Sequence, residues 1–166
     1  ALTKKGIAIS ESDIRRGLSN VSWPGRFQMI KASPAVIVDG AHNRDAALRL
    51  RECVQTCLKG KRLIFIMGVF KDKEYALIVQ TMAPLAEQIY TVWLPDRSRS
   101  LPPEVLAEEA GKYCGRTQAA DSVGTALDMA LEQAGREGVV LAFGSLSYLG
   151  QVMEEAERRR RDDRQE

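Results

Sequence analysis

The sequence lacks the short motifs that mark many complete active sites. It contains no G-x-x-x-x-G-K-[ST] phosphate loop, no G-x-G-x-x-G after its first buried strand and no G-x-S-x-G turn. It also offers no order of Ser, His and Asp, or of Cys and His, that matches a nucleophilic site. These absences indicate that the chain does not carry a complete active site of any of these kinds.

Metal-binding side chains are scarce, with three cysteines and one histidine in 166 residues. Cys53 and Cys57 are four positions apart in a segment predicted to be helical, so they share a face. No second pair completes a zinc site, and we expect no metal site in this chain. The odd cysteine count and the lack of a secretory signal favour a reducing, cytoplasmic location.

The chain also lacks the features of membrane and nucleic-acid partners. No apolar run is long enough to cross a bilayer, and a formal net charge of +2 is too small to indicate nucleic acid. Residues 158–161 are all arginine, but two aspartates follow and no aromatic residues alternate with them. A solvated helix end is therefore favoured there over a surface that binds nucleic acid.

Apolar residues make up 45% of the chain, which is enough for the core of one domain. From residue 35 on, short β-branched runs alternate with segments in which apolar residues recur at helical spacing. This alternation predicts an α/β domain with a mostly parallel sheet covered by helices on both faces. The predicted strands are 26–30, 35–38, 63–69, 89–94, 117–120 and 139–143. The predicted helices are about 10–18, 44–58, 74–85, 103–113, 121–134 and a last one after residue 145.

Three polar loops follow buried strands in this prediction, at residues 39–43, 71–73 and 144–145. Ligands of open parallel sheets bind beyond the carboxyl ends of the strands. Each loop also opens a helix, whose N-terminal N–H groups favour anions. Together the loops would bring a carboxylate, an imidazole, two ammonium groups and a hydroxyl to one edge of the sheet.

Each candidate side chain also has a structural interpretation. Asp39 can accept two hydrogen bonds from a ribose or can cap a helix. His42 lies in a polar loop rather than on an apolar face, which favours function over packing. Arg26 follows a Pro-Gly turn and suits bidentate phosphate recognition, although a salt bridge would also explain it. Lys73 can hold an anion or lie on the surface. Ser145 and the glycine before it can cradle an anion or form a turn.

Four short motifs occur in order along most of the chain. Residues 23–28 have the sequence W-P-G-R-F-Q, and residues 39–43 have D-G-A-H-N. G-x-x-x-D-K-E follows at 68–74 and G-S-L-x-x-x-G at 144–150, while I-x-x-G-L precedes them at 14–18. In this order the motifs resemble the C-terminal domain of the folylpolyglutamate synthase / dihydrofolate synthase family, within the Mur ligase superfamily.

The resemblance implies a Rossmann-like three-layer domain over residues 23–166, with residues 1–22 as a linker or the tail of a preceding domain. It implies an ATP-dependent ligase in which a substrate carboxylate attacks the γ-phosphate and the amine of glutamate then attacks the acyl phosphate. The phosphate loop and Mg²⁺ ligands of such enzymes lie in their own upstream ATPase domain, so this chain alone is expected to be inactive. A folate or dihydropteroate is the implied acceptor, and a monomer is expected.

The same resemblance assigns roles on the ATP side. Arg26 would contact the ATP phosphates and stabilise charge during phosphoryl transfer. Asp39, His42 and Asn43 would bind the ribose or nearby atoms of the nucleotide.

On the glutamate side, Lys73 and Ser145 would hold the carboxylates, and Asp72 would orient the loop. Two positions depart from the family pattern. Arg44 stands where the family has proline after D-G-A-H-N, and Ser147 stands where it more often has Tyr or His.

Two other functions remain open from the sequence. A related Mur-type ligase would join another amino acid to another acid, but W-P-G-R and G-S-L favour the folate type. A stand-alone nucleotide-binding module without catalysis is the third possibility, which an upstream phosphate loop would exclude.

Overall fold

The computed structural model describes residues 8–21 and 23–162. Its strands are β1 (Gln28–Ala32), β2 (Ala35–Val38), β3 (Leu63–Met67), β4 (Gln88–Thr91), β5 (Thr117–Ala119) and β6 (Val139–Phe143). Its helices are α1 (Glu11–Ser19), α2 (Arg44–Cys57), α3 (Tyr75–Met82), α4 (Pro103–Gly111), α5 (Val123–Ala134) and α6 (Leu149–Asp162). The short 3-10 helices η2 (Ala83–Leu85) and η3 (Leu146–Tyr148) follow α3 and precede α6. Every strand and helix predicted from the sequence is present, in the predicted order.

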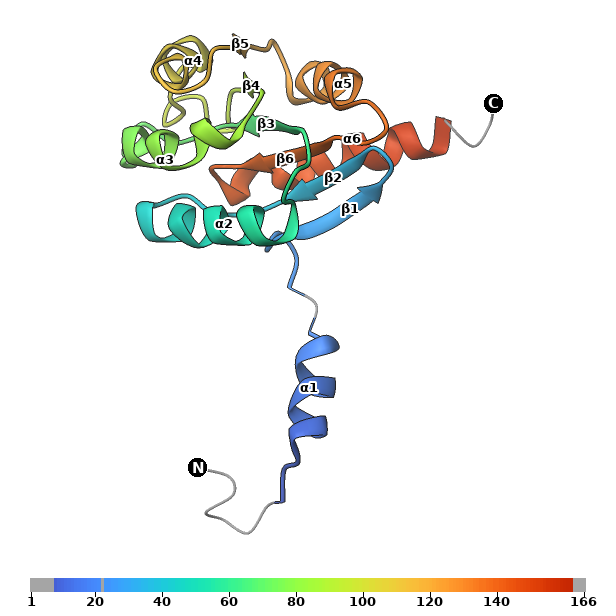
Figure 1. The fold of residues 1–166 in the computed structure, drawn as a ribbon. Helices are drawn as coiled ribbons and strands as arrows, with labels where there is room; N and C mark the ends of the chain where they lie inside the picture. The colour runs from blue at the N-terminus through green and yellow to red at the C-terminus, as the bar shows by residue number, and fades with distance from the viewer. Residues whose placement is uncertain (1–7, 22, 163–166) are drawn as a thin grey trace.

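The strands form one sheet in the order β1-β2-β6-β3-β4-β5. β1 pairs antiparallel with β2, and the other neighbouring strands in that order pair in parallel. Parallel neighbours need crossover connections, and the helices of the chain supply them (Figure 1). The expected α/β class with a mostly parallel sheet is confirmed.

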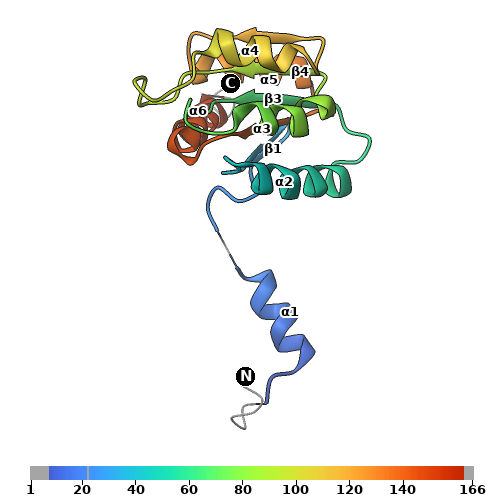
Figure 2. The same cartoon turned by 90° about the vertical axis from the view of Figure 1, so that its left-hand side faces the viewer.

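Helices cover both faces of the sheet, which gives the expected three layers (Figures 1 and 2). All residues of the central strands β3 and β6 are buried, and successive side chains point to opposite faces. Phe65 and Met67 pack in the core beneath α2, α3 and α4, whereas Ile64 and Ile66 pack in the core beneath α5 and α6. Burial on both faces explains why these strands are continuous apolar runs in the sequence.

Several boundaries differ from the sequence prediction: β3 ends at Met67 rather than at residue 69, and β4 ends at Thr91 rather than at residue 94. The first strand begins at Gln28 rather than at residue 26. Arg26 and Phe27 belong to a turn, and Phe27 has φ of 41°, which a strand does not accommodate. The helix predicted to begin at about residue 121 begins at Val123, because Ser122 is its N-cap and accepts a hydrogen bond from the Thr125 N–H.

Helix α1 lies apart from the sheet in both views (Figures 1 and 2). None of its residues is buried, and Ile14 and Leu18 leave 53% and 69% of their surface exposed. The expected domain boundary after residue 22 remains a prediction, and residues 1–7 and 22 lie outside the described part. Across residues 8–21 and 23–162, no helix has both the length and the apolar character needed to span a bilayer.

Arg159 joins α6 to α5. Its Nε lies 2.5 Å from Asp128 Oδ1, its Nη1 lies 2.6 Å from Glu155 Oε2, and its Nη2 donates to Gly124 O at 3.0 Å. The side chain is only 13% exposed, so these bonds are better shielded from water than ordinary surface pairs. Hydrogen bonds from Arg159 lower the pKa of both Asp128 and Glu155.

We predict that Arg159→Ala lowers the free energy of unfolding by about 1 kcal/mol at neutral pH. The exposed Arg160, which pairs with Glu157, serves as control, and Arg160→Ala should leave stability nearly unchanged. Carboxyl groups with lowered folded-state pKa values stabilise above the unfolded pKa of about 4 and lose that effect as pH falls through the folded values. The deficit measured by urea unfolding should therefore shrink in acid, and a deficit that stays constant with pH would contradict this account.

Candidate functional site

Three loops meet at one edge of the sheet. Residues 39–43 follow β2, residues 144–145 follow β6 and residues 68–74 follow β3. Because β2, β6 and β3 are neighbours in the sheet, their carboxyl ends lie side by side. The convergence of these loops, expected from the sequence, is confirmed.

Glycines allow these loops to touch. Gly144 has φ of 112°, and a Cβ at that position would clash with the carbonyl oxygen of Gly68. The Gly144 N–H donates to Ala41 O at 2.9 Å, and the Gly68 N–H donates to Phe143 O at 3.4 Å. Gly144, in the loop after β6, therefore contacts both the loop after β2 and the loop after β3.

Tyr148 holds the strand ends beneath these loops. Its side chain is fully buried, and its hydroxyl lies 2.7 Å from Phe143 O and 3.0 Å from Ile66 O. Burial raises the pKa of Tyr148 far above that of an exposed phenol, so the hydroxyl remains a donor. The ends of β6 and β3 therefore share one buried hydrogen-bond donor.

Asp39 connects the loop after β2 to the turn that carries Arg26. The residue is 9% exposed. Its Oδ2 accepts from the Phe27 N–H at 2.8 Å, and its Oδ1 accepts from the Ala41 N–H at 2.8 Å. Phe27 is a non-glycine residue with φ of 41°, a conformation that persists only when its surroundings enforce it. Both carboxylate oxygens therefore help to fix the backbone.

Arg26 lies on the outer side of this arrangement. Its guanidinium runs across Gly40, where an added Cβ would clash with it. The Gly40 N–H donates to Gly25 O at 2.7 Å, which holds the two segments together. Arg26 is exposed, and no ion pair holds its guanidinium within residues 8–21 and 23–162. The turn therefore exposes a guanidinium group that carries a permanent positive charge and has no ion-pair partner among the described residues.

A hollow of about 350 Å³, here named the Arg26 hollow, opens beside this side chain. His42 Nδ1 lies 2.8 Å from Gly40 O, and because a carbonyl only accepts, Nδ1 carries the proton and Nε2 is free. Asn43 caps α2, its Oδ1 accepting from the Ala46 N–H at 2.8 Å. The hollow is lined by Arg26, Asp39, His42, Asn43, Arg49 and Cys53, among others.

A second hollow of about 450 Å³, here named the Lys73 hollow, lies on the other side of His42. Ser145 is 4% exposed, and its Oγ accepts from the Ser147 N–H at 3.2 Å. The hollow is lined by His42, Phe70, Lys73, Arg99, Ser145, Leu146 and Ser147. His42 lines both hollows, so the two meet at one imidazole.

The structure brings most of the predicted side chains into these hollows. Asp72 is the exception, because it lies beside the Lys73 hollow, 3.4 Å from Arg99 Nη2. Sequence reasoning missed Arg99 and Arg49. A charged loop after β4 was visible in the sequence, but the bridge between Phe70 and Ser100 that brings this loop to the site was not.

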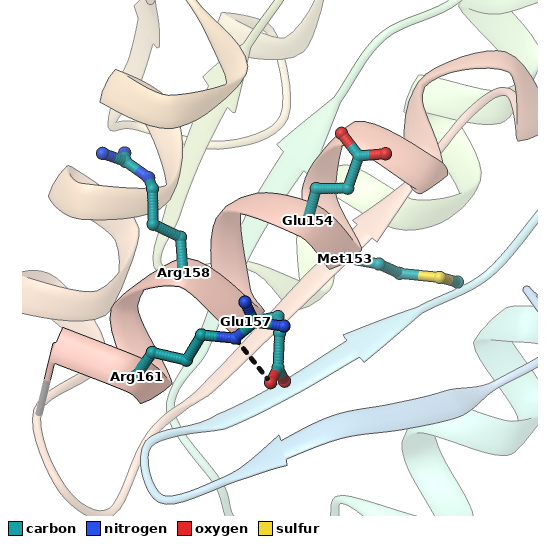
Figure 3. A pocket seen from close by; sticks show the side chains of 5 residues that line it. All are labelled: Met153, Glu154, Glu157, Arg158 and Arg161. Atoms are coloured by element: carbon teal, nitrogen blue, oxygen red, sulfur yellow. Dashed lines mark hydrogen bonds and ion pairs between the residues drawn. The ribbon is translucent and has the colours of Figure 1, made fainter. Parts of the chain in front are cut away.

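Another hollow, of about 470 Å³, lies along α6 (Figure 3). Met153 and Glu154 line it together with charged side chains that already have partners. Arg158 pairs with Glu155 and Arg161 pairs with Glu157. Because Arg158, Arg161 and Glu157 already have partners on α6, the hollow offers fewer free cations than the hollows around His42. In the part of the chain that the structure describes, no cluster of three or more His, Cys, Asp or Glu could hold a metal ion.

Family comparison identifies the class of protein to which this fold and site belong. A family profile for the Mur ligase glutamate ligase domain matches residues 25–146. The chain therefore belongs to the Mur ligase family, as its glutamate ligase domain.

Within that family, the chain is similar to dihydrofolate synthase/folylpolyglutamate synthase. The Escherichia coli K12 protein of that name is 33% identical over 160 residues, covering 96% of this chain and 37% of the relative. The Bacillus subtilis protein is 26% identical over 152 residues, covering 91% of this chain and 35% of the relative. The chain thus spans little more than a third of the length of these relatives, and the resemblance seen in the four motifs is confirmed.

Solved structures agree with this placement. The E. coli FolC complex with DHPP and ADP has a TM-score of 0.83 and 34% identity, covering 96% of this chain and 37% of that one. A Yersinia pestis folylpolyglutamate synthase/dihydrofolate synthase complexed with AMPPNP and a Mn ion has a TM-score of 0.78 and 25% identity. That match covers 94% of this chain and 37% of the Yersinia chain.

We predict that Gly144→Ala destabilises the domain by about 2 kcal/mol or more, because the new Cβ meets Gly68 O and the residue must keep its positive φ. Gly135 also has positive φ, 57°, but has open space around it, so Gly135→Ala isolates the backbone cost. Thermal unfolding of both variants measures the difference. An equal loss of stability in the two variants would mean that the close contact between the loops after β6 and β3 does not contribute to the effect of Gly144→Ala.

Proposed function

We propose that this chain is the C-terminal domain of an ATP-dependent glutamate ligase of the folylpolyglutamate synthase / dihydrofolate synthase type. One observation carries the proposal: two hollows meet at His42, with a free arginine in one and a lysine with a buried serine in the other. Such a reaction requires adjacent sites for phosphate and for an amino acid, since the activated carboxyl group must meet the incoming amine.

The Arg26 hollow suits the nucleotide. Arg26 offers a permanent charge and a planar fork of donors for phosphate oxygens. His42 and Asn43 line the same hollow, and the bond of His42 Nδ1 to Gly40 O leaves Nε2 available for a ligand. Asp39 serves this side by fixing the turn of Arg26, and its remaining lone pairs can accept hydrogen bonds from ribose hydroxyls.

The Lys73 hollow suits the amino acid. The Lys73 ammonium and the Ser145 hydroxyl can donate to glutamate carboxylates. When bound, ATP supplies the phosphoryl group that activates the carboxylate of a folate or dihydropteroate. The residues of this chain then hold the phosphates and the glutamate, so that amine and activated carboxyl group meet near His42.

The remaining parts of the reaction belong outside this chain in our proposal. The sequence has no phosphate-loop motif, and the described residues hold no metal cluster, so an upstream ATPase domain would provide the phosphate loop and the Mg²⁺ ligands. This chain alone should then be inactive. We also propose a monomer in the cytoplasm, where ATP is available and where exposed thiols such as Cys53 and Cys57 persist.

A chimera tests the proposed function. This chain replaces the matching third of the E. coli relative, and ADP release is measured with dihydropteroate or a reduced folate as acceptor. We expect ADP release that requires both acceptor and glutamate, and none from this chain alone. ADP release that ignores glutamate, or that prefers another amino acid, would contradict the proposal, as would a folded but inactive chimera.

In that chimera, Arg26→Ala should lower kcat about 100-fold, because a charge that stabilises phosphoryl transfer is lost. Arg44→Ala is the control, since it removes a nearby exposed arginine that lines neither hollow. Its kcat should stay close to that of the parent chimera. If Arg26→Ala also leaves kcat unchanged while the chimera stays active, Arg26 does not contact the phosphates.

A further inference from the structure

The loop after β4 has a well-defined backbone. Asp96 Oδ1 accepts from the Ser98 N–H at 3.1 Å, and the Ser100 N–H donates to Asp96 O at 3.0 Å. Ser100 is 3% exposed, and its Oγ accepts from the Leu94 N–H at 3.0 Å. These bonds close residues 94–100 into a fixed loop rather than a loose connection.

The same loop pairs with the loop after β3. Phe70 and Ser100 form an antiparallel bridge. The Lys71 N–H donates to Arg99 O at 2.9 Å, and the Leu101 N–H donates to Val69 O at 2.9 Å. The pairing places the backbone of Arg99 directly beside the loop that carries Lys73.

The side chain of Arg99 is oriented towards the Lys73 hollow by two neighbours. Its guanidinium carbon lies 4.5 Å from the ring centroid of Phe70, and its Nη2 lies 3.4 Å from Asp72 Oδ2. The side chain remains 54% exposed, and the long contact with Asp72 leaves most of its five N–H donors free. Arg99 lines the hollow together with Lys73 and Ser145.

We infer that Arg99 is a further substrate-binding residue, which holds one carboxylate of a dicarboxylate amino acid while Lys73 holds the other. The inference rests on the proposed function of the Lys73 hollow. Two cations lining one hollow match the two carboxylates of glutamate, and the planar fork of arginine suits one of them in bidentate geometry. Asp72 is then a positioning residue, since its own negative charge would repel the ligand and its contact is with Arg99.

Arg97 provides a matched control from the same loop. Its guanidinium carbon lies 5.1 Å from the ring centroid of Trp93, so it too is an arginine stacked on an aromatic ring. Arg97 does not line the Lys73 hollow. Replacing either arginine removes one charge and one stacking contact, but only Arg99 faces the hollow.

The test is a titration of the 166-residue chain with L-glutamate, with L-glutamine as comparison, followed by amide NMR shifts. We expect glutamate to shift Lys73, Ser145 and their neighbours in the wild type and in Arg97→Ala. In Arg99→Ala the dissociation constant should rise about fivefold or more, with Arg99→Lys intermediate. If the dissociation constant rises for glutamate but not for glutamine, Arg99 binds the side-chain carboxylate. If it rises for both amino acids, Arg99 binds the α-carboxylate.

Two results would overturn the inference and are distinguishable. Equal glutamate affinity in the wild type, Arg97→Ala and Arg99→Ala, with shifts still centred on Lys73 and Ser145, would remove Arg99 from the site and leave the proposed function standing. Absence of any glutamate-specific shift around the Lys73 hollow in the wild type would overturn the inference together with the assignment of that hollow to the amino acid.

Discussion

The site depends on the carboxylate of Asp39. One oxygen accepts from the Phe27 N–H and the other from the Ala41 N–H, both at 2.8 Å, in a residue that is 9% exposed. A charged acceptor in such a shielded place makes strong bonds, and losing it would leave two N–H groups without their acceptor. The left-handed conformation of Phe27 persists because this bond and the neighbouring backbone enforce it. The turn of Arg26 is therefore fixed against the loop after β2.

The rest of the site follows from how the sheet orders its strands. β6 lies between β2 and β3, so its loop can contact both neighbours through Gly144, and Tyr148 joins the strand ends below. This frame presents Arg26 on one side of His42 and Lys73 on the other. Phosphate chemistry and amine addition, in our proposal, would thus share one rigid edge of the sheet. In the same proposal, an upstream domain would close over that edge.

Much of this could be predicted from the sequence. From residue 35 on, short apolar runs separated by helical periodicity predicted the order of strands and helices, and the position of polar residues after strands predicted which loops converge. Contacts between segments distant in sequence could not be predicted. D-G-A-H-N does not reveal that both oxygens of Asp39 bond to backbone, and nothing local marks Phe27 as left-handed. The role of Arg99 could not be predicted, because its position depends on the bridge between Phe70 and Ser100. That bridge is a tertiary contact with no local sequence signature.

Hydrogen exchange in Asp39→Asn tests the central claim most directly. The side chains have nearly the same shape, but the amide can accept from only one of the two N–H groups that the carboxylate serves. The account predicts faster exchange of the Phe27 or Ala41 amide and altered signals from Arg26, while amides in β3 and β6 keep their protection. Unchanged protection of both amides, with unchanged Arg26 signals, would contradict the claim that this carboxylate holds the site together.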